Sequence, residues 1–143
     1  MEPLKIRKYP NKTLRQKCGL VKNITQEELD LFGNMLFSMK HFGGIGLAAP
    51  QIGISKRLIV ADTGEGPVKL ANPKILNKKG TDNMVEGCLS VPDTSVDIKR
   101  AYAIIVSGMN EKAELVELKA EGLLARVLQH EIDHLNGKLI IDY

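Results

Sequence analysis

Several features that would place this chain in a special class are missing from its sequence. Tryptophan is absent and aromatic residues make up only 4% of the chain, so we expect a core of aliphatic side chains. Two cysteines are too few for the disulfide framework of a small secreted domain. No apolar run approaches the ~18 residues that a membrane span needs, and the charged start lacks the apolar segment of a signal peptide. We therefore expect a cytoplasmic protein with no membrane partner.

Charge of one sign is not concentrated anywhere either. The net charge is +3 and no basic block stands out, so we expect no specific nucleic-acid partner. A hydrophobic fraction of 43% and a charged fraction of 26% are typical of a globular domain. A length of 143 residues fits one domain with its own core, and no linker or repeat divides the chain. We expect a single domain over residues 1–143.

One amphipathic helix is expected over residues 24–42. Thr25 and Glu28 have the spacing of a capping box, in which each side chain pairs with the other residue's backbone. The glycine pair at 43 and 44 ends the helical pattern. Apolar residues recur at steps of three and four and predict one buried stripe, which consists of Leu29, Phe32, Leu36 and Met39.

The rest of the chain is dominated by strand patterns. Strands are expected over residues 56–61, 68–76, 94–100, 101–107, 114–119 and 138–142. Pro73 interrupts the second of these and indicates an edge or a bend. A second helix is expected over residues 121–135. Because strands outnumber helices and do not alternate with them regularly, the pattern predicts an α+β fold, with antiparallel sheets packed around the C-terminal helix.

The second expected helix carries the segment QHEIDHLNG at residues 129–137. Its inward stripe, at steps of four, three and four, consists of Leu123, Val127, His130 and His134. The i, i+4 spacing points both imidazoles at one spot, which suits a tetrahedral metal ion. Glu131 lies beside them and can act as a general base on metal-activated water. The alternative is a chance match to HExxH in a charged helix.

A third metal ligand has to come from upstream. Only nine residues follow His134, and Asp142 is the only carboxylate among them. Cys88, in the segment EGCLS, is the best source because a thiolate is a good ligand for zinc or iron. The alternative for Cys88 is a small buried hydrophobic residue. Cys18 has no glycine-flanked loop and no partner, so we expect it to be structural.

Three motifs occur in order, GIGLAAPQ at 44–51, EGCLS at 86–90 and HEIDHL at 130–135, and together they resemble the signature motifs of peptide deformylases. The resemblance extends to YPNKTLR and NPKIL and covers nearly the whole chain. It implies an α+β metal-dependent hydrolase that removes the N-formyl group from the formyl-methionine of newly made peptides and releases formate. N-formyl-methionyl nascent peptides would then be the partners of the protein.

The resemblance also implies roles for individual residues. One divalent metal ion would be held by Cys88, His130 and His134. Fe²⁺ is the expected metal, and Zn²⁺, Ni²⁺ or Co²⁺ can take its place. Glu131 would be the catalytic acid and base. The Gln51 amide and the backbone N–H of Leu89 would stabilise charge on the formyl oxygen.

A peptide could bind as an added strand along the small residues of the first motif, since glycines let another backbone approach closely. Without the resemblance, a tight loop packed for space is an equal alternative. The methionine side chain needs an apolar pocket, and Ile45, Leu123 and Val127 are candidates for its wall. For Leu123 and Val127, packing in the core is the alternative role. The substrate-binding residues that we expect are Ile45, Gly46, Glu86, Gly87, Leu123 and Val127.

Asp133 is not at metal-ligand spacing, because it points roughly 100° away from His134 around the helix. We expect a supporting role for it, in an ion pair with Arg100. Asp93 stands where glycine is common in deformylases, so substrate preference beyond methionine is expected to differ. Many deformylases continue past this point into a C-terminal helix that has been linked to ribosome docking. This sequence ends at Tyr143 without such a helix, so we do not carry a ribosome contact over from the family.

Two other functions are compatible with parts of the pattern. A metallopeptidase would use the same HExxH chemistry on peptide bonds, but neither Gln51 nor the Cys88 segment belongs to that mechanism. A structural zinc site would close around the metal with four protein ligands. A fourth ligand such as His41 would favour that structural site, whereas three ligands favour a catalytic one.

Overall fold

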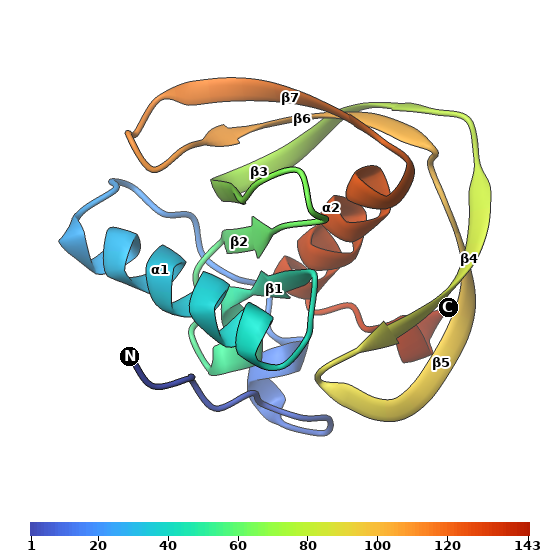
Figure 1. Cartoon of the computed structure of the whole chain (residues 1–143), viewed down its shortest axis with the longest axis horizontal. Helices are drawn as coiled ribbons and strands as arrows, with labels where there is room; N and C mark the ends of the chain where they lie inside the picture. The colour runs from blue at the N-terminus through green and yellow to red at the C-terminus, as the bar shows by residue number, and fades with distance from the viewer.

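The computed structural model describes residues 1–143 and consists of a five-stranded sheet, a two-stranded ribbon and two α-helices (Figure 1). The helices are α1 (Gln26–His41) and α2 (Gly122–Leu135), and short 3-10 turns are η1 (Lys12–Arg15), η2 (Ala49–Ile52) and η3 (Ile140–Asp142). The strands are β1 (Gly46–Ala48), β2 (Leu58–Ala61), β3 (Val68–Lys79), β4 (Asp82–Cys88), β5 (Val91–Arg100), β6 (Ala103–Met109) and β7 (Leu115–Glu121). The α+β class is confirmed.

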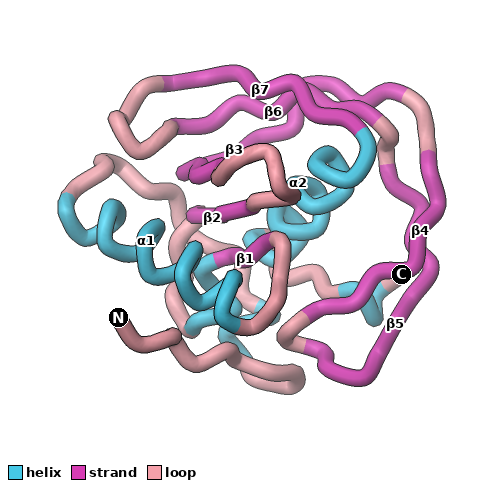
Figure 2. Tube along the Cα trace, viewed as in Figure 1, coloured by secondary structure: helices cyan, strands magenta, loops and turns pink.

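Every strand pairing is antiparallel. The larger sheet has the order β1-β2-β3-β6-β7, and β4 pairs with β5 alone. Pro73 lies inside β3, where the register shifts between Ala71 and Lys74 and Asn72 adopts a φ of 52°. β3 pairs with β2 only from Val68 to Ala71, so Pro73 lies at a bulge just beyond that pairing, where one side of β3 is free. Figure 2 shows β4 and β5 apart from the stacked strands of the larger sheet.

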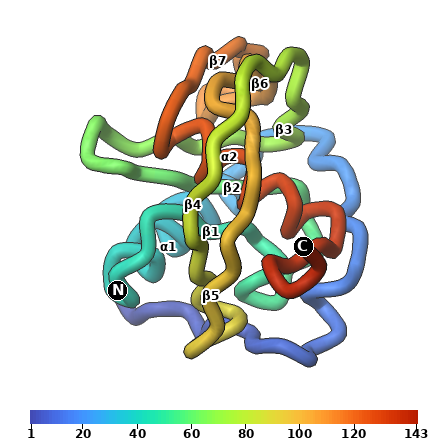
Figure 3. Tube along the Cα trace, turned by 90° about the vertical axis from the view of Figure 1, so that its right-hand side faces the viewer, coloured from blue at the N-terminus to red at the C-terminus, as the bar shows by residue number.

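Helix α2 lies between the larger sheet and the β4–β5 ribbon (Figures 1 and 3). One side of it packs on β1 and β2, with Leu128 and Leu135 fully buried in the same cluster as Ile59 and Val106. Its other side reaches the ribbon through Arg126, which donates hydrogen bonds to two backbone carbonyls there. The prediction that the sheets pack around the helix carrying the HExxH motif is therefore confirmed, and α2 is held from both sides.

Helix α1 begins as the capping box predicts. The Glu28 carboxylate accepts hydrogen bonds from the backbone N–H and the hydroxyl of Thr25, at 2.8 Å and 2.6 Å. The predicted stripe is partly wrong, because Leu29 is 37% exposed and Met35 is fully buried in its place. Phe32 and Met39 do face the core, so the buried apolar face of α1 consists of Phe32, Met35 and Met39.

Two further predictions about secondary structure are wrong. Residues 138–142 were expected to form a strand, but Ile140–Asp142 form a 3-10 turn, η3. Leu139 and Ile140 are both buried against the β4–β5 ribbon, and the Leu139 N–H donates to Oδ2 of Asp142 within the turn and not to a neighbouring strand. Strand β4 was not predicted, and Cys88 is its last residue and not part of a loop. No helix of the chain is long and apolar enough to cross a membrane.

Candidate active site

A cleft of about 480 Å³ opens between the start of β1, the end of β4 and the N-terminal half of α2. All three motifs meet there, although they are far apart in the chain. The residues lining the cleft are Gly43, Gly44, Ile45, Gly46, Gln51, Met84, Val85, Glu86, Gly87, Cys88, Leu89, Leu123, Arg126, Val127, His130 and Glu131. Every residue predicted for catalysis or substrate binding is among them.

Three ligand atoms meet at the inner end of this cleft. The Cys88 thiol lies 3.3 Å from Nε2 of His134, which in turn lies 3.3 Å from Nε2 of His130, and the three atoms are all within 4.8 Å of one another. Two nitrogens bound to a tetrahedral ion at about 2.0–2.1 Å are themselves about 3.3 Å apart. The spacing of the three atoms therefore fits a single tetrahedral metal ion.

The surroundings of these atoms also fit a cation. Burial lowers the pKa of His134 well below its usual value, which keeps the imidazole neutral and able to ligate a metal. Burial alone would also lower the pKa of His130, but the negative charges of Glu131, Cys88 and Glu86 raise it to about 10. The surrounding carboxylates and thiol thus favour positive charge at His130, whether a proton on the ring or a cation carries it.

The number of ligands distinguishes a catalytic site from a structural one. Only Cys88, His130 and His134 form a cluster with metal-ligand spacing. His41 is exposed at the end of α1, where it contacts Phe37 and Phe42. Three protein ligands would leave one position of a tetrahedral ion to water or substrate, as in catalytic sites.

Glu131 is buried beside the cluster and has an oxygen without a partner. It is only 4% exposed, and its Oε1 atom makes no hydrogen bond. Burial raises the pKa of Glu131 to about 7, against the opposing effect of His130 and Arg100. A carboxylate with a pKa near neutrality can both take and return a proton.

The side chain of Gln51 is held in one orientation at the wall of the cleft. Its Oε1 atom accepts a hydrogen bond from the Ala48 backbone at 3.0 Å. Its Nε2 atom donates to the Ser90 hydroxyl at 3.1 Å and points toward the Cys88 thiol at 3.6 Å. The amide N–H groups of Gln51 are therefore directed at the same region as the ligand atoms. Leu89 follows the last residue of β4 and lines the cleft.

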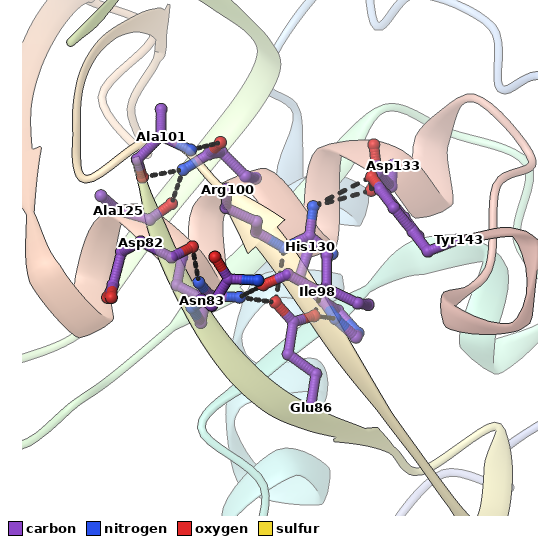
Figure 4. Close-up of polar contacts among 12 residues, drawn as sticks. Asp82, Asn83, Glu86, Ile98, Arg100, Ala101, Ala125, His130, Asp133 and Tyr143 are labelled. Carbon is purple, nitrogen blue, oxygen red and sulfur yellow. Dashed lines mark hydrogen bonds and ion pairs between the residues drawn. The ribbon is translucent and has the colours of Figure 1, made fainter. Parts of the chain in front are cut away.

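Behind His130 lies a buried network of charges, drawn in Figure 4. Oε1 of Glu86 lies 2.9 Å from Nδ1 of His130, and the same carboxylate accepts hydrogen bonds from Arg100 and Arg126. Burial would raise the pKa of Glu86, but His130 and Arg100 outweigh it and hold the pKa at about 2. Arg100 also contacts Asp133 at 2.9 Å, so the predicted ion pair is confirmed.

The expected substrate residues lie around the opening of the cleft. Ile45 and Leu123 are 42% and 43% exposed, so Leu123 does not continue the buried stripe of α2 as predicted and instead faces the cleft. Val127 is buried, and Gly46 lies against Glu131 and Val127. The Glu86 carboxylate contacts Arg100, Arg126 and His130, so it is not free to bind a substrate.

Several residues around the site were not predicted. Ser90 orients Gln51 by accepting its hydrogen bond. Ser90 is the last residue of the EGCLS motif, and this position could have indicated that it contributes to the site. Arg126 is the only charged residue within the apolar run LLARVL. A charge in such a run is buried and requires a partner, which is Glu86. Met84 and Val85 line the cleft from β4, a strand that was not predicted.

Known proteins are similar to this chain in sequence and architecture. The family model for polypeptide deformylase matches residues 3–143. A peptide deformylase from Halothermothrix orenii is 50% identical over 99% of this chain and 94% of its own length, and one from Desulfitobacterium hafniense is 48% identical over 92% of the chain and 88% of its own. The crystal structure of peptide deformylase from Thermotoga maritima superposes with a TM-score of 0.96 at 43% identity and covers 99% of this chain and 97% of that one. The chain belongs to the peptide deformylase family.

Proposed function

We propose that this chain removes the N-formyl group from the terminal formyl-methionine of newly made peptides and releases formate, with catalysis centred on Cys88, His130, His134 and Glu131. The observation that carries the proposal is the convergence of three ligand atoms beside a buried carboxylate in a peptide-sized cleft. One solved relative, the peptide deformylase of Synechococcus elongatus, is described in complex with actinonin at 43% identity and a TM-score of 0.95, covering 98% of this chain and 78% of its own.

The ligand set would hold one divalent metal ion. We propose Fe²⁺, which the family resemblance implies, while a thiolate and two imidazoles also suit Zn²⁺, Ni²⁺ and Co²⁺. When bound, the ion would act as a Lewis acid that lowers the pKa of water and polarises the formyl carbonyl. Glu86 would fix the ring of His130 from behind, as carboxylates commonly do for metal-bound histidines.

Glu131 would move the protons of the reaction. It removes a proton from water as the water oxygen forms a bond to the formyl carbon. The same proton then passes to the amide nitrogen as the C–N bond breaks, which gives formic acid and a free amine, and the acid then releases its remaining proton to become formate. A pKa near 7 allows Glu131 to do both at neutral pH.

Gln51 and the backbone N–H of Leu89 would stabilise the negative charge that develops on the formyl oxygen. The side chain of Gln51 is only 2% exposed and is already fixed by Ala48 and Ser90, so it needs little reorganisation. Donors fixed in advance are worth far more than mobile ones in such a site. Because a glutamine in this position does not belong to the HExxH metallopeptidase mechanism, its place beside the ligand atoms supports deformylation over general peptide-bond cleavage.

The substrate would enter along β1. This strand pairs with β2 on one side only, so its free edge can add a peptide strand. Ile45, Leu123 and Val127 would accept the methionine side chain, with Gly46 and Gly87 allowing close backbone approach. We propose that residues 1–143 act as one catalytic domain in the cytoplasm, where nascent chains are made.

The test is formate release by protein prepared without oxygen and loaded separately with Fe²⁺, Ni²⁺, Co²⁺ or Zn²⁺. Formyl-Met-Ala-Ser is the substrate, and acetyl-Met-Ala-Ser and an internal peptide bond are the controls. We expect formate from the formylated peptide alone. Cleavage of the internal bond without formate would identify a metallopeptidase, and no formate from any metal form would overturn the proposal.

A further inference from the structure

The side chain of Tyr143 is joined to two charged residues behind the cluster of ligand atoms. Its hydroxyl donates a hydrogen bond to Oδ2 of Asp133 at 2.5 Å and accepts one from Arg100 at 3.2 Å. The Arg100 guanidinium also lies over the Tyr143 ring, 5.1 Å from its centroid. Tyr143 thus completes a closed triangle with Arg100 and Asp133 (Figure 4).

Arg100 connects this triangle to a metal ligand. Its Nε and a terminal nitrogen donate to the two oxygens of Glu86 at 2.5 Å and 2.9 Å. Oε1 of Glu86 then lies 2.9 Å from Nδ1 of His130. An unbroken series of hydrogen bonds therefore runs from Tyr143 through Arg100 and Glu86 to the back of the His130 ring. The side chains of Arg100 and Glu86 are 4% and 7% exposed, so water competes little for these bonds.

The segment that carries Tyr143 is itself held in place. Asp142 pairs with Arg15 and accepts a hydrogen bond from the Leu139 backbone at 2.8 Å. Leu139 and Ile140 are buried against Val91 and Ile98 of the ribbon. The Lys138 ammonium lies 3.8 Å from the centroid of the Tyr143 ring. Tyr143 is therefore presented to Arg100 by a fixed element, although its own side chain is 46% exposed.

We propose that Tyr143 is a positioning residue for the metal ligand His130, acting through Arg100 and Glu86. The proposal rests on the metal site of the proposed function. Arg100 is shared between two carboxylates, Glu86 and Asp133, which pull it in different directions. The Tyr143 hydroxyl holds both Asp133 and Arg100, so it fixes the direction in which Arg100 presents its nitrogens to Glu86.

Removing the hydroxyl would loosen this arrangement without touching a ligand. Asp133, whose side chain is 24% exposed, could then turn toward water and release one side of Arg100. Residues that hold a metal-bound histidine directly are worth roughly 10–100-fold in metal affinity. Because Tyr143 acts through two intermediates, we expect a smaller effect, roughly three- to tenfold.

The test compares Tyr143→Phe with Tyr102→Phe, a matched change at a tyrosine that is 48% exposed elsewhere on the surface. The affinity for Zn²⁺ and Co²⁺ is measured by competition with a chromogenic chelator, and the rate of Zn²⁺ loss is followed separately. We expect Tyr143→Phe to weaken metal binding and to speed metal loss, each by roughly three- to tenfold. Tyr102→Phe should bind like the wild type, and the KM of formyl-Met-Ala-Ser on fully loaded protein should be unchanged in both.

A double-mutant cycle with Arg100→Lys separates positioning from general loosening of the fold, because the contacts that link Tyr143 to Glu86 run through the Arg100 guanidinium. If Tyr143 acts through Arg100, the double variant should bind metal no more weakly than Arg100→Lys alone. Wild-type metal affinity in Tyr143→Phe, or fully additive effects in the cycle, would overturn the proposal. Because metal binding is measured without substrate, this result is independent of whether formate is released. A wild-type protein that binds no metal would instead overturn the metal site.

Discussion

The backbone of Gly46 lies directly against the carboxylate of Glu131. A β-carbon built on Gly46 would overlap Oε2 of Glu131 and would lie 2.7 Å from Cγ1 of Val127. Both neighbours are buried on α2, so a β-carbon at this position would force one of them to shift. The first strand of the sheet therefore sets the position of the proposed general base, and a residue larger than glycine at that point would displace it.

Replacing Gly46 by Ala should consequently displace Glu131. We expect kcat/KM for formyl-Met-Ala-Ser to fall by roughly 100-fold, since a displacement of about 1 Å in a reacting group costs that much. Gly33→Ala is the control, because a β-carbon there meets nothing within 4 Å. Activity of Gly46→Ala close to that of Gly33→Ala would mean that Glu131 tolerates the displacement or is not the base.

Ser90 is expected to matter through Gln51. Its hydroxyl is fully buried and accepts a hydrogen bond from the Gln51 side-chain amide at 3.1 Å. Ser90→Ala would remove this acceptor and leave the amide of Gln51 free to rotate. We expect kcat to fall roughly tenfold with little change in KM, a smaller loss than removing an oxyanion donor altogether. Ser107→Ala on β6 serves as the control, and steady-state kinetics of both variants provide the measurement. Equal kcat values in the two variants would exclude this role for Ser90.

The two cysteines should behave in opposite ways on substitution. Cys18 is 4% exposed inside the main core cluster, so Cys18→Ala should lower the free energy of unfolding by about 1 kcal/mol and leave the metal content unchanged. Cys88→Ser should keep most of the stability but weaken Zn²⁺ binding by at least roughly 100-fold, because a hydroxyl is a poor ligand for zinc. Metal analysis and urea unfolding would distinguish these outcomes. Full metal content in Cys88→Ser would remove Cys88 from the ligand set.

The chemistry of the site was more predictable from the sequence than parts of the surrounding fold. His130, Glu131 and His134 share one helix, so their spacing alone indicates that they converge. The position of Cys88 relative to them depends on how β4 packs beside α2, which no local pattern records. The role of Tyr143 depends on η3, which forms because Leu139 and Ile140 are buried together and Arg15 holds Asp142. Contacts of this kind are tertiary, and they overrode the strand pattern of the segment.

Because of Glu28 at the start of α1, the free energy of unfolding should decrease as the pH becomes acidic. Bonds from Lys56 and Thr25 lower the pKa of Glu28 from 4.5 to about 2. Because the folded pKa lies below the unfolded one, this stabilisation is complete above about pH 4.5 and is lost as the pH falls toward 2. Glu28→Gln should lower the free energy of unfolding at pH 7 by about 1–2 kcal/mol. The difference between variant and wild type should vanish near pH 2.

Glu27→Gln is the control for this prediction. Glu27 also contacts Lys56, at 3.1 Å, but its side chain is 69% exposed. Exposed pairs contribute little, so the change should cost less than about 0.5 kcal/mol at any pH. Urea unfolding at several pH values measures both variants. A difference for Glu28→Gln that stays constant from pH 7 to pH 2 would contradict the lowered pKa.

In the proposed mechanism Glu131 transfers the protons of a metal-dependent deformylation, and Glu131→Gln removes this ability alone. The substitution keeps the shape of the side chain and touches none of the three ligand atoms. Metal content and formate release from formyl-Met-Ala-Ser should be measured on the same preparation. We predict one metal per chain, as in the wild type, with kcat reduced by at least roughly 100-fold. Full metal occupancy with wild-type turnover would show that Glu131 does not transfer these protons.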